Sequence, residues 1–214
     1  MRQDLLERLS KEIEKTYMKC SLSLPFHGWH HISFVYNKSL EFANDLSADS
    51  FFVGAAALTH DLNYLVKVNS MTSQGKDLRN FILAEVGFDK LEILRIEKIV
   101  NEANISVRDK NISLEAKALS DADTLFKALP ITPIIFAKLY AQEQSLNIKD
   151  LAIKIVRDQE RLLEQGIYFY SKNADRYLKW AQVNIELWKN VVAFFSEEDF
   201  SNYFQLFTEF KLKN

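Results

Sequence analysis

Glycine, proline and cysteine are scarce in this chain, and each shortage excludes a class of structure. Five glycines and three prolines in 214 residues are too few for the tight turns of a fold built from many short strands. The single cysteine, Cys20, excludes an internal disulfide and a thiolate zinc cage, which fits a reducing compartment. No apolar run reaches the roughly 20 residues of a spanning helix, and residues 1–15 contain no apolar signal core. We therefore expect a soluble, unprocessed cytoplasmic protein.

An excess of charge of one sign is also missing. The 27 basic and 29 acidic side chains are mixed along the chain and leave a formal net charge of -2. Nucleic acids and anionic membranes are bound by broad positive surfaces. We therefore expect neither of them as a partner.

Apolar residues instead recur three or four positions apart over long stretches, which predicts an all-α fold. An apolar stripe formed by Leu5, Leu9, Ile13 and Tyr17 marks a first helix. The same pattern predicts further helices over Trp29 to Leu46, Ser50 through Asp61, Thr72 to Val86, Lys90 to Asn104, Ser113 to Leu129, Pro133 to Gln142, Ile148 to Tyr170, Ala174 to Phe195 and Asp199 to Lys211. With no repeat and no Pro-rich or Ser-rich linker, residues 1–214 are expected to form a single helical domain.

All four histidines lie in two short patches, His27 with His30 and His31, and then His60. On a helix, His31 shares a face with apolar residues three and four positions later, whereas His30 shares one with polar residues. A ligand that is held by packing loses less entropy on binding. We therefore choose His31 over His30 as a metal ligand, and leave open whether His27 adds a ligand, orients a substrate phosphate or caps the helix.

His60 and Asp61 form the only His-Asp pair and follow an apolar run that ends in small residues. Neighbouring side chains on a helix project about 100° apart, so one ion can contact both. The three alanines Ala55, Ala56 and Ala57 allow close helix packing, which would bury the Asp61 carboxylate and create a need for a cation. The pair is therefore predicted to bind a divalent metal.

A third patch, Asp121 and Asp123, offers the last carboxylate. Asp123 has apolar Leu119 and Phe126 at helical offsets and is predicted to point inward. Asp121 is expected to pair with Lys117 on the surface or to accept a hydrogen bond from a ligand imidazole. Imidazoles and carboxylates in the order H, HD, D suit one divalent metal and point to metal-assisted hydrolysis.

These three patches resemble the segments of the HD-domain metal-dependent phosphohydrolases. The resemblance rests on three strings, His27-Gly28-Trp29-His30-His31, Ala57-Leu58-Thr59-His60-Asp61 and Ser120-Asp121-Ala122-Asp123-Thr124-Leu125. It implies that His31, His60, Asp61 and Asp123 are the metal ligands. It also implies an HD-domain-like helical bundle with its core at about residues 26–129 and additional helices at about 133–211 packing on it.

The resemblance implies an enzyme that hydrolyses a phosphoester bond of a nucleotide or another small phosphorylated metabolite. Asp61 is expected to accept or orient the proton of the attacking water, and Lys127 and His27 to contact the substrate. One divalent ion is expected, with manganese, magnesium, cobalt, nickel, iron and zinc all admitted by the ligand types. Several subfamilies place an acidic residue within a turn of the HD pair, whereas Leu62 to Leu65 contain none. A catalytically silent metal-binding or nucleotide-binding module therefore stays open as the alternative.

The C-terminal third is rich in aromatic rings but carries no transferable motif. The rings are Tyr168, Phe169, Tyr170, Tyr177, Trp180, Trp188, Phe194, Phe195, Phe200, Tyr203, Phe204, Phe207 and Phe210. Core packing is the simplest interpretation. A wall on which a nucleobase stacks and a homodimer interface are the two sharper ones.

Overall fold

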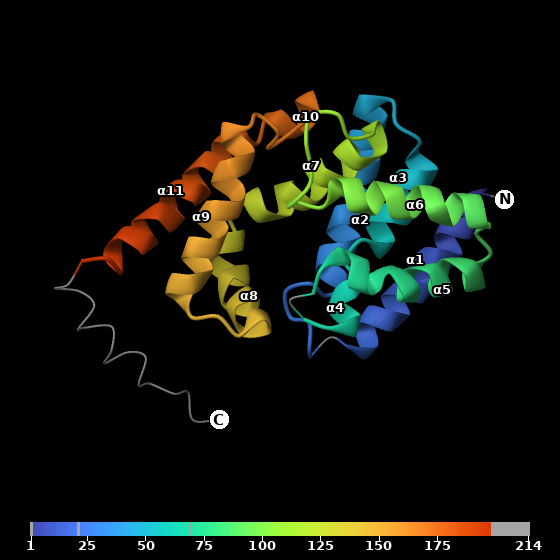
Figure 1. The fold of residues 1–214 in the computed structure, drawn as a ribbon, viewed down its shortest axis with the longest axis horizontal. Helices are drawn as coiled ribbons and strands as arrows, with labels where there is room; N and C mark the ends of the chain where they lie inside the picture. Colours follow the sequence, from blue (N-terminus) through green and yellow to red (C-terminus); the bar gives the residue numbers. More distant parts are fainter. Residues whose placement is uncertain (1, 21, 69, 198–214) are drawn as a thin grey trace.

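The computed structural model describes residues 2–20, 22–68 and 70–197 and contains helices joined by short loops (Figure 1). The α-helices are α1 (Arg2–Lys19), α2 (Trp29–Leu46), α3 (Ser50–Thr59), α4 (Asn63–Val66), α5 (Lys76–Val86), α6 (Lys90–Ala103), α7 (Leu114–Ala128), α8 (Ala137–Gln144), α9 (Ile148–Glu164), α10 (Lys172–Asp175) and α11 (Leu178–Phe194). A 3₁₀ turn, η1 (Thr72–Gly75), precedes α5, and a π-helical turn, η2 (Thr132–Phe136), precedes α8. These ranges contain no strand, so the predicted all-α class is confirmed.

Helix α3 lies at the centre of the N-terminal part. Every residue from Phe51 to Thr59 is buried, because α1, α2, α6 and α7 all pack around it. Its small residues, including Ala55, which is 0% exposed, let those neighbours approach closely. Helix α2 packs most extensively against α7. The end of α3 is therefore held between the helices that carry the other predicted ligands.

The C-terminal helices α8, α9 and α11 lie to one side of this core, at the left of Figure 1. They bury two smaller apolar clusters of their own, one around Leu162 and Ile185 and one around Leu151 and Trp188. Asn184 Nδ2 on α11 donates to the carbonyl oxygens of the last residues of α7, with 2.9 Å to Ala128 O. Helix α7 thus joins the two parts, while the single-domain organisation stays a prediction.

Several helix boundaries differ from the prediction. The range predicted over Thr72 to Val86 is η1 followed by α5, and the one predicted over Pro133 to Gln142 begins within η2 and continues in α8 to Gln144. Helix α9 ends at Glu164 rather than Tyr170, because Gly166 takes a positive φ of 63° and the Ile167 N–H turns back to Leu162 O at 3.0 Å. The helix predicted over Ala174 to Phe195 is divided into α10 and α11. The helix predicted over Asp199 to Lys211 and the rings from Phe200 to Phe210 lie outside the described residues.

A search of the described residues for membrane-crossing helices finds no single helix of sufficient length and apolarity. One bent pair, Leu114–Ala128 with Thr132–Gln144, meets the criteria of length and composition together, with a bend of 72° at its break.

Candidate metal centre

The HD pair lies in the turn after α3, and the prediction that the helix continues through it is wrong. Asp49 caps the start of α3 by accepting from Phe51 N at 3.1 Å. At the other end, the carbonyl oxygen of Thr59 accepts from Arg79 Nη1 at 3.2 Å, instead of from the N–H four residues later. The buried guanidinium thereby ends the helix and leaves His60 and Asp61 free to turn toward α2.

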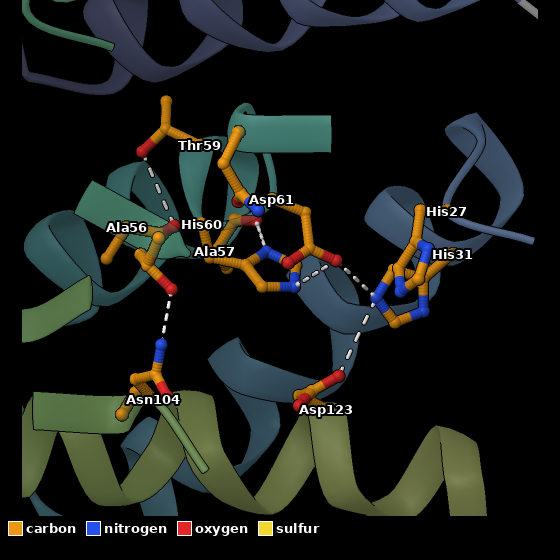
Figure 2. A network of polar contacts seen from close by, with 12 residues as sticks. His27, His31, Ala56, Ala57, Thr59, His60, Asp61, Asn104 and Asp123 are labelled. Atoms are coloured by element: carbon orange, nitrogen blue, oxygen red, sulfur yellow. Dashed lines mark hydrogen bonds and ion pairs between the residues drawn. The ribbon is translucent and has the colours of Figure 1, made fainter. Parts of the chain in front are cut away.

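Three of the predicted ligands come together at this turn. His31 Nε2 on α2 and His60 Nε2 each lie 3.1 Å from Asp61 Oδ2. One ligand atom from each residue can be chosen so that all three lie within 4.8 Å of one another. Figure 2 shows the Asp61 carboxylate between the two rings. This is a group of donors that could hold a metal ion.

The ring nitrogens at the centre of the cluster have no hydrogen-bond partner in the described structure. His60 Nδ1 donates to the carbonyl oxygen of Ala57 at 2.8 Å, which leaves the lone pair on Nε2. His60 Nε2 and both ring nitrogens of His31 are buried without a hydrogen bond among the described residues. Because buried polar atoms are normally paired, these orphan nitrogens fit a site whose missing partner is a cation.

Asp123 on α7 faces the same cluster from the opposite side (Figure 2). Its Oδ1 lies 3.6 Å from His31 Nε2, and it does not belong to the group of three. Its Oδ2 pairs with Lys127 Nζ at 2.5 Å, and Arg108 Nη2 lies 3.9 Å away. Asp123 is therefore placed to complete the donor set but is engaged by two cations here.

The charged groups of the cluster shift one another's pKa values. Burial alone would raise the pKa of Asp61, but the His60, His31 and His27 rings together outweigh it and hold the pKa well below its usual range. Burial also opposes ionisation of Asp123, yet Lys127 and the imidazoles bring its pKa to about 2. Burial lowers the pKa of His31 to about 4. Burial also opposes protonation of His60, but Asp61, Asp123 and the Ala57 carbonyl together outweigh it and raise its pKa. Two carboxylates that stay charged beside an uncharged imidazole form a suitable cation site.

His27 precedes α2 and belongs to a group that sequence reasoning missed. Gly28 occupies the cap position of α2, so His27 lies just outside the helix. Its ring Nδ1 contacts Glu143 Oε1 on α8, and Tyr64 stacks on the ring with centroids 3.7 Å apart. No sequence pattern links these residues, because Glu143 is separated from His27 by 116 positions.

Asp121 has a structural role, and its predicted surface pair with Lys117 is wrong. The side chain is 0% exposed, and its two oxygens accept from Tyr170 N and Ser171 N at 2.8 Å each. Burial raises the pKa of this carboxyl to about 6 even though those N–H groups oppose the rise. Asp121 therefore fastens the segment after α9 to α7, and no ligand imidazole donates to it.

The cluster opens into a cavity of about 480 Å³. His60, Asp61, Asp123, His27 and Lys127 all contribute to its walls, while His31 lies behind it with 0% exposure. Polar side chains from the loop after α4 and from the end of α6 complete the rim. A cavity of this size admits a small phosphorylated molecule.

Comparisons with known proteins place the fold. No family model matches the chain, and no curated protein matches it. The chain is similar to the crystal structure of Bacillus subtilis YpgQ, with 18% identity, a TM-score of 0.57 and coverage of 100% of this chain and 99% of that one. A protein from Lactobacillus plantarum gives 19% identity and a TM-score of 0.65 over 90% and 95% of the two chains. YpgQ in complex with ADP gives 21% identity and 0.58 over 88% and 94%. The chain therefore has the helical fold of the YpgQ-like proteins.

Proposed function

We propose that this protein is a metal-dependent phosphohydrolase of the HD-domain type. Its reaction is the hydrolysis of a phosphoester bond in a nucleotide or another small phosphorylated metabolite. The observation that carries the proposal is the cluster of His31, His60 and Asp61, with its orphan ring nitrogens beside a polar cavity. A structural metal site needs no such opening.

The donor set fits one divalent cation. His31 and His60 would supply imidazole nitrogens and Asp61 and Asp123 carboxylate oxygens, a mixture that manganese, iron, cobalt, nickel, zinc and magnesium all accept. When bound, such an ion supplies a Lewis acid that lowers the pKa of a water molecule and neutralises charge on a phosphate.

The chain's own residues take the remaining roles. Asp61 orients the attacking water and accepts its proton, because its carboxylate is charged and lies at the cavity wall. Lys127 Nζ neutralises a phosphate oxygen once it exchanges its contact with Asp123 for the substrate. His27 contacts the phosphate from the same wall. The water oxygen forms the new bond to phosphorus as the P–O bond to the leaving group breaks, and the proton that Asp61 accepted from the water passes to the leaving oxygen.

A nucleotide is the substrate class with most support. One similar structure is YpgQ in complex with ADP, so a protein of this fold accommodates a nucleoside diphosphate. The cavity beside the cluster has room for a phosphate group together with a sugar.

A catalytically silent module that binds a metal or a nucleotide is the second candidate. It is favoured by the segment that follows Asp61, because residues 62–65 contain no carboxylate that could act as a second acid or base. Such a module would keep the metal site for folding or ligand sensing.

Phosphate release distinguishes the two candidates. Wild type, Asp61→Ala and Asp77→Ala would be compared on a panel of nucleotides and sugar phosphates with Mn²⁺, Co²⁺, Ni²⁺ or Mg²⁺. Asp77 is an exposed acid in the first turn of α5 and serves as the matched control. We expect release by wild type and Asp77→Ala and none by Asp61→Ala. Silence of a folded, metal-loaded wild type on the whole panel would favour the binding module.

A further inference from the structure

A second cavity of about 120 Å³ adjoins the metal centre. Both cavities are lined by His27, Tyr64, Ile105 and Lys127, so they share a wall. The second cavity is built mainly by the C-terminal helices α8, α9 and α11, which carry none of the predicted metal ligands. A molecule whose phosphates contact Lys127 can therefore extend its other end toward these helices.

Aromatic rings and apolar side chains form one part of the wall of this second cavity, beside polar side chains that include Lys127 and Lys154. Phe26 and Tyr140 lie stacked with ring centroids 4.5 Å apart and planes at 27°. Trp188 from α11, which is 6% exposed, and Ile155 from α9 contribute the facing surface. The aromatic and apolar faces favour a planar heterocycle, and both lysines of the wall are already paired, Lys127 with Asp123 and Lys154 with Asp158.

One side of the cavity carries a donor next to an acceptor. Gln159 is 6% exposed, and its Oε1 accepts from Tyr168 Oη at 2.7 Å, which fixes the amide so that Nε2 is the group left to donate. Within the described residues Gln159 Nε2 has no partner. The adjacent Asp158 carboxylate is held by Lys154 Nζ at 2.9 Å and Arg157 Nε at 2.8 Å and can accept a further hydrogen bond. The edge of a nucleobase presents the complementary pair, an N–H donor beside a ring nitrogen or carbonyl acceptor.

We propose that this second cavity is the base subsite of a nucleotide whose phosphates lie at the His31, His60 and Asp61 cluster. The proposal rests on the proposed function for the position of the phosphates, but it concerns binding and not hydrolysis. It gives the C-terminal helices a role in choosing the substrate, with Tyr140 and Trp188 as the stacking walls and Gln159 and Asp158 reading the base edge.

The test compares nucleotides with a ligand that has no base. Isothermal titration with Mn²⁺ present would give the affinities of ADP, GDP, CDP, UDP and inorganic pyrophosphate for wild type, Ile155→Trp and Ile153→Trp. Ile155 lines the cavity, whereas Ile153 lies on the same helix with 42% exposure and is the matched control. We expect at least one nucleotide to bind wild type and Ile153→Trp at least tenfold more tightly than pyrophosphate. In Ile155→Trp that preference falls to less than twofold, while pyrophosphate binds as before.

A second variant and a second readout guard against misfolding of the first. Gln159→Leu removes the donor without adding bulk and is expected to reduce the preference for the base at least fivefold. Trp188 is one of three tryptophans, so a base stacked beside it quenches fluorescence in wild type but not in Trp188→Phe. Equal affinity for pyrophosphate and all four nucleotides, or a preference that survives in both Ile155→Trp and Gln159→Leu, would overturn the base subsite. A protein that binds nucleotides as expected but releases no phosphate would contradict the proposed hydrolysis and leave the subsite intact.

Discussion

Glu143 and His27 form a buried pair that joins helix α8 to the metal centre. Glu143 Oε2 accepts from the backbone N–H groups of Phe26 and His27 at 3.0 Å each, and Oε1 contacts His27 Nδ1. Because an ionised carboxylate can only accept, Nδ1 must carry the proton and the other ring nitrogen is left for the cavity. Tyr64 stacks on the ring and fixes its plane. The pair supplies a carboxylate near the site from a distant part of the chain, whereas residues 62–65 contain none.

The first prediction concerns catalysis by this pair. Glu143→Gln is expected to lower kcat by about 10-fold to 100-fold, the usual effect of losing a group that orients a site residue, with a smaller change in KM. Steady-state phosphate release with saturating metal measures both constants. Glu160→Gln, which removes a carboxylate paired with Lys189 away from the site, is the control and should match wild type. An unchanged kcat in Glu143→Gln would show that the orientation of His27 by Glu143 does not contribute to catalysis.

The second prediction concerns pH. Burial opposes ionisation of Glu143, but its hydrogen bond and charge interaction with His27 outweigh burial and hold the pKa below the usual 4.5. A carboxylate with a lowered folded pKa stabilises the fold above its unfolded pKa, and this contribution is lost as pH falls through the folded pKa. Glu143→Gln should therefore lower the free energy of unfolding by about 1–3 kcal/mol near pH ~7, and by progressively less as the pH falls through the folded pKa of Glu143. Urea unfolding at a series of pH values checks this, and a loss that does not change with pH would contradict it.

The third prediction concerns the buried ion pair behind the HD turn. Arg79 is 0% exposed, its Nε lies 2.5 Å from Glu97 Oε1, and its Nη1 donates to Thr59 O. Arg79→Met is expected to cost about 3–5 kcal/mol of unfolding free energy, because Glu97 is left buried without its partner. Arg79→Met combined with Glu97→Met should cost less than Arg79→Met alone. Urea unfolding measures both differences.

The matched control for Arg79 is an exposed pair. Lys38 Nζ lies 2.8 Å from Glu41 Oε2 on the surface of α2, and Lys38→Met should change stability by less than about 1 kcal/mol. A similar cost for Arg79→Met and Lys38→Met would show that the buried pair does not hold the HD turn.

A helix boundary could be predicted where the residues that determine it are neighbours in the sequence. Helix α2 was predicted over Trp29–Leu46, the range that the structure shows, since apolar periodicity and the glycine before it lie in one stretch of sequence. The end of α3 was missed because Arg79, some 20 residues later, takes the Thr59 carbonyl. The end of α9 was missed although Gly166 marked it, because aromatic residues beyond it continue the apolar pattern.

The same distinction between near and distant determinants holds for the residues of the candidate site. The choice of His31 over His30 followed from helix faces, and the structure buries the first and exposes the second. Neither expected partner of Asp121, Lys117 or a ligand imidazole, is the one found, because the N–H groups that donate to its carboxylate belong to Tyr170 and Ser171, far along the chain. Glu143 had no motif to mark it. Periodicity identifies which side of a helix faces inward, but it does not identify a partner on another helix.

The fourth prediction concerns Lys127. Its ammonium lies 2.5 Å from Asp123 Oδ2 and lines both cavities. Lys127→Met should lower kcat/KM for phosphate release by about 10-fold or more, because a phosphate oxygen loses its countercharge. The control is Lys117→Met, the same substitution at a lysine that lies earlier on α7, and it should retain wild-type activity. Equal kcat/KM in the two variants would exclude Lys127 as a substrate contact.

Metal stoichiometry tests the central claim most directly. Equilibrium dialysis against Mn²⁺, followed by elemental analysis, would be applied to wild type, His31→Ala and His30→Ala. These two histidines are neighbours in sequence, but only His31 belongs to the cluster. The account predicts one Mn²⁺ per chain for wild type and His30→Ala and a loss of about 10-fold to 100-fold or more in affinity for His31→Ala. A wild type that binds no divalent metal, or a His31→Ala variant that binds it as wild type does, would contradict the account.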